Sequence, residues 1–136
     1  MQRPFSDLTL RHLARVVESS DDAIISKDLN GIILSWNSAA ERMFGYTEQE
    51  AVGMSIRKLI PADLQAEEDV VLAKIRAGES VDHYETIRQR KDGTTLRISL
   101  TISPIRNDRG EIVGSALLPS GETRAVLLVP LPEGRE

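Results

Sequence analysis

The sequence predicts an α+β domain in which a five-stranded antiparallel sheet is interrupted by a helical insert. Three observations lead to this fold class. First, an Asn30-Gly31 turn separates two short apolar runs, which is a strong hairpin signal. Second, residues 38–77 carry repeated helix caps and stops. Third, apolar and polar residues alternate without a break between Thr95 and Ser103, which is the pattern of a half-buried strand.

The bulk composition excludes several classes of function. The 136 residues fit one domain with one sizeable core. The absence of cysteine excludes disulfides, thiolate nucleophiles and cysteine-type zinc sites. The net charge of −4 is spread in mixed sign, so we expect no nucleic-acid partner. No apolar run approaches the roughly 18 residues of a spanning helix, so we expect no membrane contact by this segment and a cytoplasmic location.

Residues 1–20 form the first predicted unit, an amphipathic helix over residues 7–19. Its apolar positions include Leu10, Leu13 and Val17, at a spacing that suits a helix better than a strand. A helix this short is marginal alone. Its apolar stripe therefore packs either on its own domain or on a second copy of the chain, and the sequence leaves both open.

Two antiparallel strands are predicted next, at residues 23–26 and 32–36, and two short capped helices follow them. The first helix begins with a capping box from Ser38 to Glu41 and ends at Gly45. The second repeats the pattern from Thr47 to Gly53. Because this helix pair is too small to stand alone, it must lie on a sheet.

One more turn at residues 55–60 precedes the longest predicted helix, at residues 62–77. Its acidic residues lie mostly in the first half and its basic residues in the last turn, which suits the helix macrodipole. The adjacent acids Glu67, Glu68 and Asp69 point apart on a helix, so they define no two-carboxylate site. We interpret them as a solvated helix face.

The last three strands are predicted at residues 81–90, 95–103 and 112–118. Asp92-Gly93 joins the first two, and the turn at residues 107–110 leads to the third. Which face of the strand at residues 81–90 is buried stays ambiguous, because apolar residues occur at both odd and even positions. In the tail, residues 119–136, a further strand at residues 125–129 is possible before two prolines.

Residues 21–118 resemble a PAS sensory domain in the order and spacing of their motifs. The motifs are Asp28-Leu29-Asn30-Gly31, Trp36-Asn37, Ala40, Phe44-Gly45-Tyr46, Glu50 with Gly53, and Arg90-Lys91-Asp92-Gly93-Thr94. The resemblance implies a five-stranded antiparallel sheet with short helices packed on one face and a small cavity between them. It also implies that apolar residues of the insert and of the inner sheet face line this cavity. The candidates are Met43, Phe44, Leu72, Ile75, Tyr84, Ile98 and Leu100, each of which would also fit an ordinary core.

The cofactor is left unknown, because the residues that name the common ones are missing. Haem-binding PAS relatives carry a ligand histidine on the long helix, whereas residues 64–77 hold none and Glu68 lies near that position. Flavin and thioester chromophores need a cysteine, which the chain lacks. His83 remains a weakly supported haem ligand, and His12 is weaker still. No phosphate loop, metal-binding histidine pair or nucleophile elbow is present, so we do not expect an enzyme.

The resemblance favours a signal-input module of a bacterial signal-transduction protein, of the sensor histidine kinase type. We expect a homodimer through the N-terminal helix (Leu10, Leu13 and Val17) or through the sheet face, with a possible small ligand in the cavity. The alternative is a protein-interaction module with a filled core and no ligand. Such domains usually leave their last strand through an Asp-Ile-Thr type motif into a signalling helix, whereas this chain continues with Leu118-Pro119-Ser120-Gly121.

Overall fold

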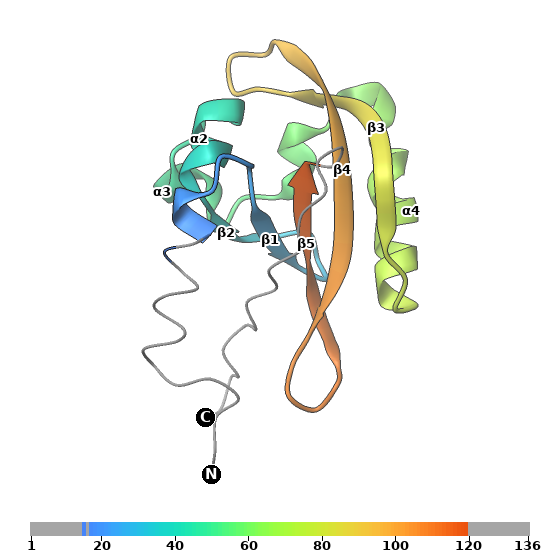
Figure 1. Cartoon of the computed structure of the whole chain (residues 1–136). Coiled ribbons are helices and arrows are strands. Elements are labelled where there is room, and N and C mark those ends of the chain that lie inside the picture. Colours follow the sequence, from blue (N-terminus) through green and yellow to red (C-terminus); the bar gives the residue numbers. More distant parts are fainter. Residues whose placement is uncertain (1–14, 16, 120–136) are drawn as a thin grey trace.

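A computed structural model of the chain describes residues 15 and 17–119, which form a five-stranded antiparallel sheet and its covering helices (Figure 1). The strand order is β2-β1-β5-β4-β3. The strands are β1 (Ile25–Asp28), β2 (Ile33–Trp36), β3 (Val81–Gln89), β4 (Thr95–Arg106) and β5 (Ile112–Pro119). The predicted fold class is confirmed. Most of the predicted N-terminal helix, with Leu10 and Leu13, and the possible strand at residues 125–129 lie outside the described residues.

The insert between β2 and β3 consists of short helices. They are α2 (Ser38–Phe44), α3 (Glu48–Ala51), the 3₁₀ turns η1 (Ile56–Leu59) and η2 (Ala62–Leu64), and α4 (Ala66–Arg76). The helix predicted over residues 62–77 is therefore a 3₁₀ turn followed by an α-helix. The change comes at Gln65, whose side-chain amide donates to the carbonyls of Arg57 and Ile60 and ties this turn to η1. Figure 1 places α2 and α3 beside β1 and β2, and α4 behind β3.

The caps of α2 and α3 show one error and one success of the sequence analysis. The N-cap of α2 is Asn37, whose side chain accepts from the Ala40 amide, and not Ser38. The Ser38 hydroxyl instead donates to the carbonyl of Glu18 at 2.8 Å. The second predicted capping box, Thr47 with Glu50, is present in full.

The ambiguous facing of β3 is resolved by its contacts. Tyr84, Thr86 and Arg88 point to the helical side, where their polar groups meet α4. Ile87 points the other way and is exposed. The inner face of this edge strand is therefore polar, whereas the inner faces of β1 and β4 supply Ile25, Leu100 and other residues of the apolar core.

Candidate functional site

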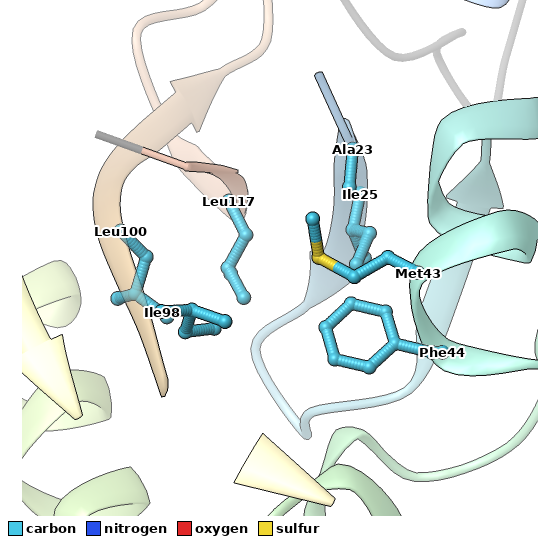
Figure 2. A pocket seen from close by; sticks show the side chains of 7 residues that line it. All are labelled: Ala23, Ile25, Met43, Phe44, Ile98, Leu100 and Leu117. Atoms are coloured by element: carbon cyan, nitrogen blue, oxygen red, sulfur yellow. The ribbon is translucent and has the colours of Figure 1, made fainter. Parts of the chain in front are cut away.

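An apolar cavity of about 20 Å³ lies between α2 and the sheet. Figure 2 shows Met43 and Phe44 reaching from α2 toward Ile98, Leu100 and Leu117 on β4 and β5. Since roughly 10–15 Å³ is needed to hold a single water molecule, the cavity is about one water in size. Ala23, Ile25, Met43, Phe44, Ile98, Leu100 and Leu117 line it.

Four of the seven candidate ligand-binding residues, Met43, Phe44, Ile98 and Leu100, meet at this cavity. The other three lie elsewhere: Ile75 is fully buried in the apolar core, Leu72 is half-buried on α4, and Tyr84 makes a polar contact with α4. The role of all seven in ligand binding stays a prediction. The sequence analysis missed Ala23, Ile25 and Leu117, although the pairing of the first and last strands would have placed the last two together.

Beside the cavity, three donors on β3 converge on one carboxylate, that of Glu67 in the first turn of α4. The Tyr84 hydroxyl donates to Oε2 at 2.8 Å, the Thr86 hydroxyl to Oε1 at 2.9 Å, and Arg88 Nη1 to Oε1 at 2.9 Å. We call Tyr84, Thr86 and Arg88 the β3 cradle. Partial burial opposes ionisation of Glu67, but the three hydrogen bonds outweigh it and hold its pKa below the ordinary value. The bond to Glu67, with burial, raises the pKa of Tyr84.

The next residue of α4, Glu68, makes a buried ion pair with Lys27 of β1. Lys27 Nζ lies 3.0 Å from both carboxylate oxygens, and the two side chains are 1% and 4% exposed. Burial lowers the pKa of Lys27, although the attraction of Glu68 works against this. The sequence analysis expected Glu68 near the position of a haem-ligating histidine, and the structure shows the carboxylate of Glu68 bound to the amine of Lys27.

The third acid of the series, Asp69, accepts from Arg57 of η1 at 2.7 Å on the surface. Three consecutive carboxylates of α4 therefore meet three cations from three different elements. The interpretation of all three as a solvated helix face was wrong for Glu67 and Glu68. Neighbouring positions on a helix do point apart, as expected. However, Glu67 points to β3 and Glu68 points to β1, and neither points to solvent.

Asn37 joins the N-terminal segment to α2 through all four hydrogen bonds that an amide can make. Its Oδ1 accepts from the amides of Ile24 and Ala40, and its Nδ2 donates to the carbonyls of Val17 and Asp22, all at 2.9–3.0 Å. The residue is buried. Whatever displaces the N-terminus of α2 therefore acts directly on the chain around residue 17.

The remaining histidine candidate lies away from the cavity. His83 is exposed, does not line the cavity, and has a positive φ of 51° at the irregular pairing between Val81 and Tyr84. His12 lies outside the described residues. Across residues 15 and 17–119, no group of three or more metal-ligating side chains occurs. In the same part of the chain, none of the helices has both the length and the apolar character needed to cross a membrane.

The family model described as "PAS fold" matches residues 11–118. Among curated proteins, the Sensor protein FixL of Bradyrhizobium diazoefficiens is 33% identical over 71% of this chain and 20% of its own length. The signal transduction histidine-protein kinase AtoS of Escherichia coli is 30% identical over 79% of this chain and 17% of its own. The chain thus spans about a fifth of the length of these relatives. A crystal structure of a PAS domain from Colwellia psychrerythraea has a TM-score of 0.74 at 26% identity, covering 82% of this chain and 95% of that domain.

Proposed function

The chain belongs to the PAS fold family, and on that premise we propose that it is the cytoplasmic signal-input module of a bacterial sensor histidine kinase that transmits through a homodimer. A PAS domain is a sensory module and not itself a catalyst. The two curated relatives, a sensor protein and a histidine kinase, support the kinase type. The observation that carries the proposal is the position of the cavity under α2, the helix whose N-cap Asn37 donates to the carbonyl of Val17 in the N-terminal segment.

The proposed mechanism runs through α2 and Asn37. A ligand that enters the cavity pushes on Met43 and Phe44, which line it from α2. Asn37 caps the other end of α2 and passes the shift to the carbonyl of Val17. The packing of residues 7–19 against a second copy then changes. Ligand binding and dimerisation are coupled because both favour the same position of α2.

Light scattering of purified variants tests the dimer. We expect the wild type to be a dimer and Leu10→Asp/Leu13→Asp to be a monomer, because a charge in an apolar interface is left unpaired. Val70→Asp is the matched control, since Val70 is an exposed apolar residue on α4, and it should stay dimeric. If the double variant keeps the wild-type mass, residues 7–19 are not the interface and the sheet face takes their place in the proposal.

The second candidate, a protein-interaction module with a filled core, is favoured by one observation, the small size of the cavity. A space of about 20 Å³ is far below the roughly 300–1,000 Å³ of ordinary ligand pockets. A ligand must therefore open the domain to bind. Native mass spectrometry separates the two candidates, because a bound compound adds a defined mass to the dimer, whereas the interaction module has the mass of its polypeptide alone.

A further inference from the structure

The β3 cradle is a complete set of donors for a carboxylate, and all three donors lie on one strand. Tyr84, Thr86 and Arg88 occupy alternate positions of β3, so their side chains share one face. Each residue pairs with β4, opposite Leu100, Ile98 and Leu96 respectively. Together they give the carboxylate of Glu67 two hydroxyl donors and a guanidinium, the charge-assisted kind of donor that binds carboxylates most strongly.

Glu67, which is bound in the β3 cradle, lies on a different element from the three donors. Glu67 comes from the first turn of α4, whose N-cap, Gln65, makes no side-chain capping hydrogen bond. The Glu67 side chain is 18% exposed, whereas that of Arg88 is 7% exposed. The Glu67 carboxylate is therefore the partner with the greater access to solvent, and the Arg88 guanidinium is the more buried one.

The cradle also adjoins the apolar cavity. Thr86 pairs with Ile98 and Tyr84 with Leu100 across β3 and β4, and Ile98 and Leu100 both line the cavity. Figure 2 shows these two side chains directed at Met43 and Phe44 of α2. A carboxylate held in the cradle thus has the wall of an apolar space directly beside it.

We propose that the β3 cradle recognises a small monocarboxylate with an apolar tail, and that Glu67 is an internal competitor that occupies the site until such a ligand arrives. The ligand carboxylate replaces that of Glu67 on Tyr84, Thr86 and Arg88, and its tail extends between Ile98 and Phe44. These two side chains must move apart to admit it, because the cavity of about 20 Å³ holds no more than about one water molecule. Glu67 moves to solvent, and the first turn of α4 is released from β3. The inference rests on the proposed sensory function and names the chemical class of its signal.

Titration with sodium octanoate tests the competition. Trp36 is the one tryptophan of the chain. The centroid of its ring lies 5.7 Å from the centroid of the Phe44 ring, so its fluorescence reports on the cavity. We expect Glu67→Gln to bind octanoate at least about tenfold more tightly than the wild type, because the fraction of open cradles rises. Glu79→Gln is the matched control: it makes the same change of net charge at an exposed side chain that follows α4, and it should bind as the wild type does.

Two further measurements test the ligand class. Acetate should bind Glu67→Gln more weakly than octanoate, by about fourfold for each methylene buried. In Glu67→Gln/Arg88→Gln, octanoate affinity should fall at least about tenfold, while circular dichroism shows a folded domain. If Glu67→Gln does not fold, Glu67→Asp replaces it, because this side chain keeps its charge but is too short to reach the cradle.

The proposal is overturned if folded Glu67→Gln binds octanoate no better than Glu79→Gln, or if removal of Arg88 leaves the affinity unchanged. Neither result touches the proposed function, which is tested separately by the mass of the dimer and of any compound bound to it. A bound compound without a carboxylate would support the sensory function and refute the assignment of the cradle.

Discussion

Removing the amine of Lys27 should destabilise the domain more than the loss of any surface ion pair. In Lys27→Met, the carboxylate of Glu68 stays buried at 4% exposure but loses the ammonium group that donates to both of its oxygens. Leaving one partner of a buried pair uncompensated costs about 3–5 kcal/mol. Domains of this kind have a total stability of about 5–15 kcal/mol, so the variant should lose about a fifth of its stability or more.

A second change, Glu68→Leu, should restore stability to Lys27→Met. In Lys27→Met/Glu68→Leu no buried charge is left, and apolar replacements of buried pairs are commonly neutral or stabilising. The double variant should therefore be more stable than Lys27→Met alone. On the surface, Lys91→Met breaks a pair whose side chains are 50% and 41% exposed, and it should destabilise the domain much less than Lys27→Met does.

Urea unfolding at pH 7, followed by the fluorescence of the buried Trp36, measures all three variants by linear extrapolation. A Lys27→Met variant within 1 kcal/mol of the wild type, at an unchanged urea dependence, would refute the cost assigned to the uncompensated carboxylate. A double variant as unstable as the single one would refute it too, because the loss would then come from packing and not from the charge.

Three other changes should have distinct effects. Asn37→Ala should cost at least about 2 kcal/mol in urea unfolding, because it removes the cap of α2 and leaves buried backbone groups without a partner; a loss below 0.5 kcal/mol would contradict the bonding described. The folded-state pKa of Glu67 lies below its ordinary 4.5, so its contribution is full above pH 4.5 and is lost as the pH falls through the lowered value. The stability difference between the wild type and Glu67→Gln should therefore narrow from pH 7 to pH 3.5, and a constant difference would refute the role of charge. Gly114→Ala should prevent folding, as judged by circular dichroism, because the new methyl group would collide with the carbonyl oxygen of Lys27; a native spectrum would show that β1 and β5 can move apart.

The fold was predictable because its signals are local. The turn at Gly31 and the alternation in β4 each depend on residues within a few positions of one another, and both led to the right elements. The cap of α2 was misassigned because Asn37 and Ser38 are both good capping residues. The choice between them depends on Val17 and Ile24, which lie 20 and 13 positions away.

The charged part of the site could not be found in the same way. Glu68 and Lys27 are 41 positions apart, and Glu67 and Arg88 are 21 apart. A run of acids has the same pattern whether it faces solvent or buried cations, so only the positions of β1 and β3 decide between the two. One signal was available: Tyr84, Thr86 and Arg88 share a parity, and an edge strand with three polar residues on one face is a reason to look for an acid opposite.

The glycine at position 114 also fixes the register of the central strand β5. β5 lies between β1 and β4, and Gly114 pairs with Asp28 on one side and with Ile105 on the other. Because only a residue without a side chain fits against the carbonyl of Lys27, β5 cannot slide along β1 to another register. Leu117 of β5 therefore lies opposite Ile25 of β1 in every copy of the domain, so that the same two side chains always form this part of the cavity wall.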